Sequence, residues 1–415
     1  MAIPQNNKEL IFVCAAFLVG DAIMLAISTQ DIGYILFEYM FGHRDFFNDW
    51  RNLYLLASQL PDPNATHLYS PPVTWFMSLA SKQMNYGASI FLFAVPIALL
   101  ALALWRLSRD VFVALLVVCS YPFLFSVARG NMELHVFLLV FVGLLARAKN
   151  RNGLFFFLIF LASLVKPFAL VFLLVAARHS WLRITAIAVA SAIANLFLLY
   201  CLNNLGLEAI QRYFAAAQTY ERLMVFGPGG DLFNNSFYIF FGKLVLGVRN
   251  PLALPMAEII SVALVSLTTL CSAWVLGFFD RTGDNISDSL EYITYMMLPI
   301  FLIWCIPVSA DYRLCYFLLS VYFVICTGNR YFDDTTKVVL LLWYFLIISP
   351  KHFIYFGDEL SGALRYDSLR AGLKYTLQSI VNPVLMFLLC PILVYALYRS
   401  RLKHQNTAFA DQSQL

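Results

Sequence analysis

Apolar runs of membrane-spanning length recur from one end of this 415-residue chain to the other. A helix needs about 20 mostly apolar residues to cross the roughly 30 Å hydrocarbon core of a bilayer. Charged residues make up only 13% of the chain, whereas soluble domains carry about 25%. We therefore expect an all-α, polytopic integral membrane protein. A β-barrel would instead show alternating segments of about ten residues.

The apolar pattern predicts about twelve transmembrane helices. Several are shorter than a full crossing, and the two on either side of Lys166 are expected to form a short hairpin. Short or broken helices are tolerated where a wet cavity satisfies the freed backbone groups. The expected limits are 9–29, 86–107, 111–127, 133–147, 153–165, 167–178, 182–203, 253–278, 289–307, 314–328, 335–350 and 376–398.

Four short basic clusters predict the orientation of these helices: "RLSR", "RAKNR", "RHSWLR" and "RSRLK". Short loops rich in Lys and Arg remain in the cytoplasm. With an even number of spans, all four clusters fall on one face together with both termini and the tail 399–415. The long loops 30–85, 204–252 and 351–375 then lie on the extracytoplasmic face. We expect a bacterial inner (plasma) membrane protein whose long loops face the periplasm.

Charge and cysteine patterns exclude several functions. No Lys or Arg run suggests nucleic-acid binding, and the eight cysteines all fall inside apolar segments. The six histidines have no spacing typical of metal ligands. We therefore expect no metal, no cofactor and no nucleic-acid partner.

The loop 30–85 holds two carboxylates that could perform chemistry. Asp49 is followed by Leu53 and Ala57 at helical spacing, and Asp45 lies one helical turn earlier. A carboxylate at the membrane surface can act as a general base if the proton that it takes lies within hydrogen-bond reach. The alternative is that both acids only solvate a loop.

Three cations are expected near the same membrane surface: Arg129, Lys166 and Arg313. A charge at bilayer depth costs a few kcal/mol on insertion scales, so such residues are paired, functional or extended towards the membrane surface. Several cations near a carboxylate would suit a lipid-linked phosphate.

Five segments, taken in order, resemble the GT-C membrane glycosyltransferases, and among them glycosyltransferase family 87. They are "DWRNLYLLASQL…HLYSPPVTWFMSLASK", "VARGNMELHVFLLVFVGLLA", "GLFFFLIFLASLVKPFALVFLLVAARHSWLR", "NNSFYIFFGKL" and "IPVSADYRLCYFLL". The resemblance covers roughly residues 10–330. The late turn departs from the family pattern, because it reads Ser-Ala-Asp-Tyr-Arg where an aromatic residue and a His are expected.

The resemblance implies one transmembrane glycosyltransferase domain over residues 1–415, with loop 30–85 as its active-site loop. It implies an inverting enzyme that moves mannose or another hexose or pentose from a polyprenyl phosphate to a lipid-linked or cell-envelope glycan. Asp49 would be the catalytic base, with Asp45 as a second carboxylate candidate. Lys166, Arg129 and Arg313 would bind the donor phosphate. The remaining substrate contacts implied are Arg51, Tyr54, Tyr69 and Asn131.

Two other functions stay open at this stage. A lipid-linked glycan flippase or transporter would carry cations along a path through its spans instead of at one face. A polymerase of the O-antigen type would carry its large loop near the middle or end of the chain, so the early Asp loop argues against it.

Overall fold

The computed structural model describes residues 47–59, 70–202, 253–278, 283–306, 311–349, 355–356 and 375–412, with 235–238 and positions 208, 211–212, 215 and 241. Its contacts divide the chain into two compact units. The N-terminal unit is Asp21–Gly227, and the C-terminal unit is Met1–Gly20 with Pro228–Leu415. The first predicted helix, 9–29, lies outside the described residues. The expectation of a single domain stays a prediction.

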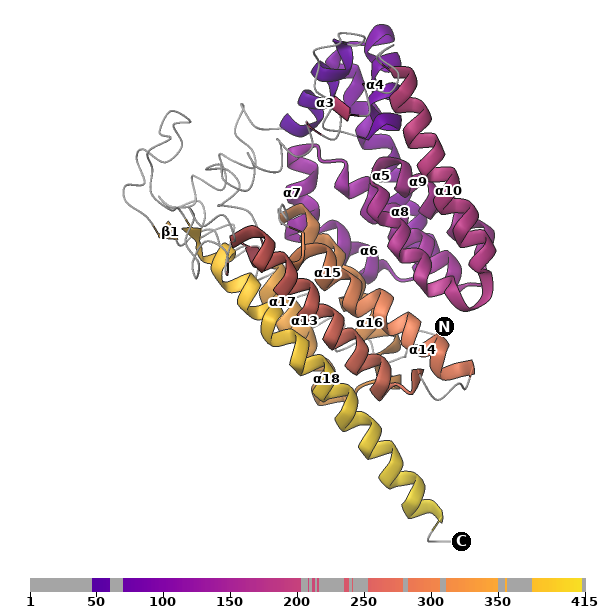
Figure 1. The fold of residues 1–415 in the computed structure, drawn as a ribbon, viewed down its shortest axis with the longest axis vertical. Coiled ribbons are helices and arrows are strands. Elements are labelled where there is room, and N and C mark those ends of the chain that lie inside the picture. Colours follow the sequence, from indigo (N-terminus) through magenta and orange to yellow (C-terminus); the bar gives the residue numbers. More distant parts are fainter. Residues whose placement is uncertain are drawn as a thin grey trace. The chain divides into compact units, whose positions relative to one another are not determined.

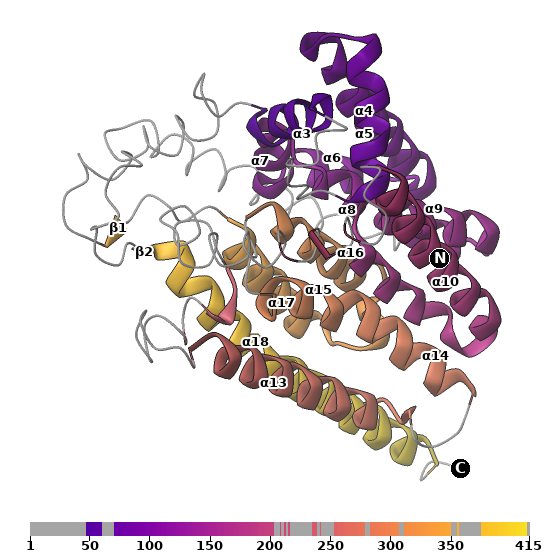
Figure 2. The ribbon, with the colours of Figure 1, turned by 45° about the horizontal axis from the view of Figure 1, so that its top comes forward.

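The N-terminal unit is a bundle of helices built around α8 (Figures 1 and 2). Helix α8 packs against α5 and α9, and its residues from Leu134 to Ala146 are almost all buried. The helices are α3 (Asn48–Ser58), α4 (Pro71–Gln83), α5 (Tyr86–Ser108), α6 (Val111–Val118), α7 (Tyr121–Arg129), α8 (Glu133–Ala148), α9 (Asn152–Val165), the 3-10 helix η1 (Pro167–Ala176) and α10 (Ala177–Leu202).

The C-terminal unit has α15 and α16 at its core, where Trp304 and Phe317 are fully buried. Helix α18 packs against α13 and α17. The elements are α13 (Ala253–Val275), α14 (Gly283–Tyr292), the π-helix η4 (Ile293–Met297), α15 (Leu298–Trp304), the 3-10 helix η5 (Asp311–Tyr316), α16 (Phe317–Thr327), the 3-10 helix η6 (Gly328–Arg330), α17 (Asp334–Ile348), the short antiparallel strands β1 (Tyr355–Phe356) and β2 (Tyr375–Thr376), and α18 (Leu377–Gln412).

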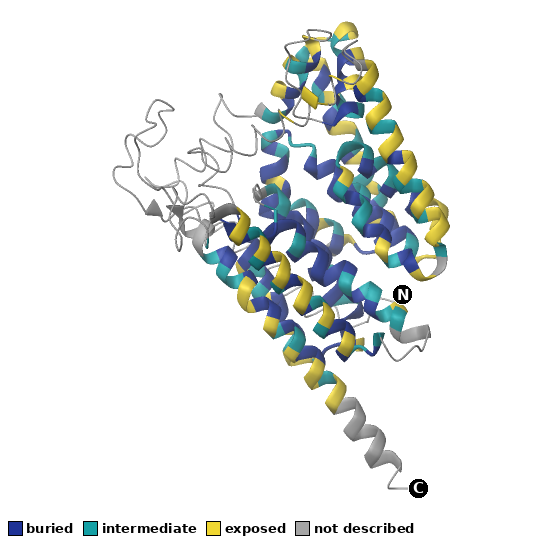
Figure 3. Cartoon of the chain, viewed as in Figure 1, coloured by how far each residue is buried: buried dark blue, intermediate teal, exposed yellow. Residues whose placement is uncertain are grey.

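The structure confirms the prediction of a helical protein with apolar helices of membrane-spanning length. It does not confirm the number of twelve spans. Within the described residues, five helices are long and apolar enough to cross a membrane. Large apolar residues are among the exposed positions of α5 and α10, and such positions suit contact with lipid. Figure 3 shows exposed positions in yellow, and they run along α10. The count of twelve and the GT-C type stay predictions. The five helices span Tyr86–Ser108, Ser180–Cys201, Pro255–Val275, Ile286–Trp304 and Val381–Leu402.

Prolines accompany two breaks in the apolar runs: the break at Lys166 was predicted, and the break inside 111–127 was not. The predicted helix 111–127 is two helices, because the chain at Ser120 is extended before α7 begins at Tyr121-Pro122. Lys166 is likewise extended, with φ −142° and ψ 111°, between α9 and η1. A residue before proline avoids the α-helical region for steric reasons, which accounts for Lys166. In a continuous helix Pro122 would lack the hydrogen bond to the Val118 carbonyl and would clash with it, which accounts for the end of α6 at Val118. Ser70 is non-helical as well, with φ −59° and ψ 143°, and α4 begins at Pro71 directly after it.

Candidate active site

Helix α3 carries Asp49 and is fixed by the side chains on its inner face. Trp50, Leu53 and Ala57 are 0–3% exposed, and their spacing places them on one side of a helix. The Trp50 indole donates a hydrogen bond to Ser89 Oγ on α5 at 3.1 Å. Asp49 itself is partly open, with 20% of its side chain exposed. A buried helix face thus holds this carboxylate at the surface of the N-terminal unit.

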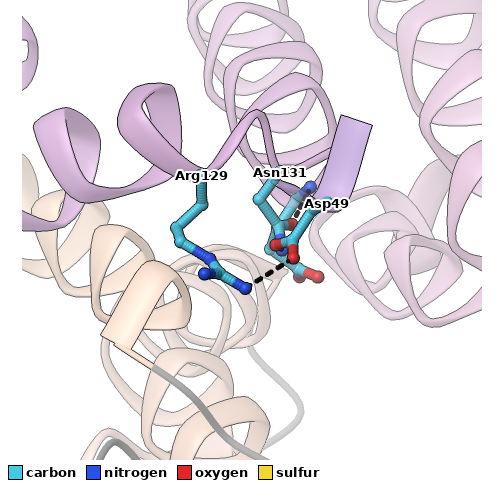
Figure 4. Close-up of polar contacts among 4 residues, drawn as sticks. Asp49, Arg129 and Asn131 are labelled. Carbon is cyan, nitrogen blue, oxygen red and sulfur yellow. Dashed lines mark hydrogen bonds and ion pairs between the residues drawn. The ribbon is translucent and has the colours of Figure 1, made fainter. Parts of the chain in front are cut away.

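The turn between α7 and α8 supplies two donors to this carboxylate (Figure 4). Arg129 Nη2 lies 2.9 Å from Asp49 Oδ1, and Asn131 Nδ2 lies 2.6 Å from Asp49 Oδ2. The Asn131 amide oxygen accepts the backbone N–H of Glu133 at 2.8 Å, at the start of α8. One end of the amide therefore faces the carboxylate, and the other end caps a helix.

This arrangement places positive charge beside the Asp49 carboxylate. The ion pair with Arg129 is a charge-assisted hydrogen bond, which is about twice as strong as a neutral one. The N-terminus of α8 adds a partial positive charge close by. A carboxylate accepts about four hydrogen bonds, so these two donors do not exclude a substrate hydroxyl as a further donor.

Lys166 reaches the same helix start from the break between α9 and η1. Its Nζ lies 4.0 Å from Oε2 of Glu133, whose side chain is fully buried, while 36% of the Lys166 side chain is exposed. Two hydrogen-bonding steps, through Glu133 and Asn131, connect this ion pair with Asp49. Lys166 therefore offers a partly exposed cation whose ammonium group is paired with a buried carboxylate.

Of the other predicted site residues, the structure describes Tyr54, Arg51 and Arg313. Tyr54 donates its hydroxyl to the Met84 carbonyl at 2.9 Å and so joins α3 to the end of α4. Arg51 is exposed on α3, and Arg313 is half-buried in η5 of the C-terminal unit. Asp45 and Tyr69 lie outside the described residues. The roles assigned to all of these residues stay predictions.

Three residues that matter for this geometry were absent from the sequence-based site. They are Phe47, Gly130 and Glu133. Gly130 left a signal in the sequence, since it separates Arg129 from Asn131, two residues already expected at the site. Glu133 follows Arg129 by four residues, a spacing that suggests an ion pair between them, whereas the structure pairs Glu133 with Lys166. No group of three His, Cys, Asp or Glu side chains suited to a metal ion occurs in the part of the chain that the structure describes.

The fold and the site together define a helical membrane protein with a polar carboxylate site at one end of a bundle. Residues 67–304, more than half of the chain, match the sequence model of glycosyltransferase family 87. The chain belongs to glycosyltransferase family 87, and it is a membrane glycosyltransferase. The match includes Arg129, Asn131 and Lys166, whereas Asp49 precedes it. No curated protein and no solved structure matched the chain in the same comparisons.

Proposed function

We propose that this glycosyltransferase moves a sugar, mannose or another hexose or pentose, from a polyprenyl phosphate to a lipid-linked or cell-envelope glycan. Asp49 acts as the general base. It takes the proton of the acceptor hydroxyl while the hydroxyl oxygen attacks the anomeric carbon of the donor. The bond from that carbon to the phosphate oxygen breaks, and its electron pair leaves with the polyprenyl phosphate. The configuration at the anomeric carbon is inverted.

The observation that carries this proposal is the Asp49 carboxylate between Arg129 and Asn131. A general base needs a fixed position relative to the proton that it removes, and donors to both carboxylate oxygens supply that position. The guanidinium of Arg129 has five N–H donors, so its contact with Asp49 is compatible with a further contact to a phosphate. Lys166 offers a second cation for the negative charge that grows on the leaving group.

The position of the basic loops supports an extracytoplasmic site. Asp49, on α3, lies beside the beginning of α8, to which Asn131 connects it, and Lys149 follows the last residue of α8. Burial and the nearby charges of Arg109 and Arg151 lower the pKa of Lys149, which means that two of the short basic loops meet there. Helix α8 has 16 residues, so about 24 Å separates its ends at a rise of 1.5 Å per residue. We infer a cytoplasmic basic end and a periplasmic site.

Family membership favours an enzyme over the flippase or transporter that the sequence left open. The two can be separated with purified protein in liposomes that contain a synthetic polyprenyl-phosphate sugar. We expect sugar transfer only when an acceptor glycan is added, with an inverted anomeric configuration in the product by NMR. Retained configuration would contradict the single displacement. Movement of the donor between leaflets without any transfer would support the transporter instead.

A further inference from the structure

Two residues with left-handed backbone conformations meet directly beside Asp49. Phe47, just before α3, has φ 56° and ψ 24°, and Gly130, just after α7, has φ 63°. A left-handed conformation is strained in a residue with a side chain such as Phe47. The Phe47 backbone N–H donates to the Ala128 carbonyl at 2.8 Å. The beginning of α3 is therefore attached to the end of α7 through backbone as well as side chains.

Gly130 leaves no room for a side chain at this contact. A Cβ atom there would lie 2.8 Å from Trp50 Cβ and 2.9 Å from Phe47 Cδ1. Real Cβ atoms essentially never approach other atoms below 3.0 Å. Glycine also permits the positive φ that commonly ends a helix. The site thus requires glycine for two separate reasons, and the steric one involves α3 itself.

The atoms facing Gly130 cannot easily move away. Trp50 and Phe47 are 3% and 8% exposed. The Phe93 ring packs edge-on against both, at centroid distances of 5.3 Å and 5.2 Å. Trp50 Cβ is bonded directly to the backbone, so relief of a clash there requires a shift of α3. Such a shift would carry Asp49 with it.

We propose that Gly130 is a positioning residue, which seats α3 against the α7–α8 turn and so holds Asp49 between Arg129 and Asn131. Only the expected loss of activity rests on the proposed function; the positioning of Asp49 by Gly130 does not. The two donors, Arg129 and Asn131, flank Gly130, and the acceptor Asp49 lies between Phe47 and Trp50. The contact of Gly130 with α3 therefore fixes the positions of the donors and the acceptor relative to one another. The hydrogen bonds to Asp49, at 2.6 Å and 2.9 Å, do not tolerate a displacement of about 1 Å.

The test compares Gly130→Ala and Gly130→Asn with the control Gly153→Ala. Asn adopts positive φ more readily than Ala but carries the same Cβ, so the pair separates the backbone requirement from the steric one. A Cβ at Gly153 would meet nothing within 4 Å. We expect both Gly130 variants to lose about 10²-fold in kcat, with little change in the KM for donor, and Gly153→Ala to match wild type. Wild-type activity in Gly130→Asn beside a reduced kcat in Gly130→Ala would show that only the positive φ matters and would overturn the inference.

A second readout reports the seating of Asp49 without reference to transfer. Carbodiimide labelling of carboxylates, followed by mass spectrometry, should proceed faster at Asp49 in both Gly130 variants than in wild type. The labelling of Asp288, a carboxylate paired with Arg330 at 3.3 Å, should stay constant and so exclude general unfolding. Faster labelling at Asp49 with unchanged kcat would keep the positioning role and refute Asp49 as the base. Unchanged labelling at Asp49 would refute the positioning role.

The variant Phe47→Ala tests the same contact if the Gly130 variants do not fold. It removes atoms from the contact and therefore introduces no steric overlap. It removes the ring that packs on Gly130 and Phe93. We expect faster labelling at Asp49 and lower kcat, because the start of α3 is then held less firmly. Wild-type labelling and kcat in Phe47→Ala would contradict the proposal.

Discussion

At the scale of single residues, the site is defined by partners that lie far apart in the sequence. Arg129 and Asn131 follow Asp49 by 80 and 82 positions. The sequence indicated each of these residues separately, from charge, local pattern and family resemblance. It could not indicate that Arg129 faces the proposed base, because this pairing depends on how α3 packs against the α7–α8 turn.

Lys166→Met tests whether this cation serves the donor phosphate. Loss of one charge-assisted contact to a phosphate should weaken binding of the donor by about 1.5–3 kcal/mol and should leave acceptor binding nearly unchanged. The measurement is the KM for each substrate in turn.

The control for this variant addresses the buried Glu133 carboxylate, which loses its Lys166 partner in Lys166→Met. The double variant Lys166→Met with Glu133→Gln removes that buried charge as well. We expect the double variant to recover thermal stability but to keep the defect in donor use. Normal use of donor by Lys166→Met would reduce Lys166 to a structural partner of Glu133.

At the scale of elements, hydropathy predicted that the apolar runs form helices and placed the break at Lys166, but it missed the break inside 111–127. The breaks before α7 and before η1 follow from Pro122 and Pro167, whereas α10 bends at Ser180 without a proline. The helical spacing of Leu53 and Ala57 behind Asp49 did predict α3. Its buried contact with Gly130 could not be predicted, because it joins two segments about 80 residues apart.

The Tyr54 hydroxyl tests how α3 is anchored. Tyr54→Phe removes its hydrogen bond to the Met84 carbonyl, and a typical hydrogen bond contributes about 1 kcal/mol to stability. We expect a lower thermal midpoint in detergent with an unchanged KM for both substrates. Tyr395→Phe, at an exposed position on α18, is the control. A raised KM with an unchanged midpoint would instead support the substrate contact that the family resemblance implied.

At the scale of the whole molecule, the central expectation is a chain with both termini in the cytoplasm and its site on the other side. The short basic loops that meet near Lys149 agree with the rule that such loops remain inside.

Topology reporters test this orientation in intact cells. Reporters at the N-terminus and after Leu415 should both give a cytoplasmic signal, and a reporter at Asp62 should give an external one. The reason is that the basic clusters hold their loops inside, whereas long loops are translocated regardless of charge. A cytoplasmic signal from Asp62 would overturn the proposed side of the active site.

The most direct test of the account is sugar transfer from a synthetic prenyl-phosphate donor by purified Asp49→Asn. Asparagine keeps the size of the side chain but cannot take up a proton at neutral pH, so transfer should fall by about 10²–10⁴-fold with the fold intact. Asp45→Asn should lose much less, and Asp288→Asn, which also breaks a carboxylate–arginine pair, should stay near wild type. An active Asp49→Asn beside an inactive Asp45→Asn would move the base to Asp45, and full activity in both variants would contradict general-base catalysis by this loop.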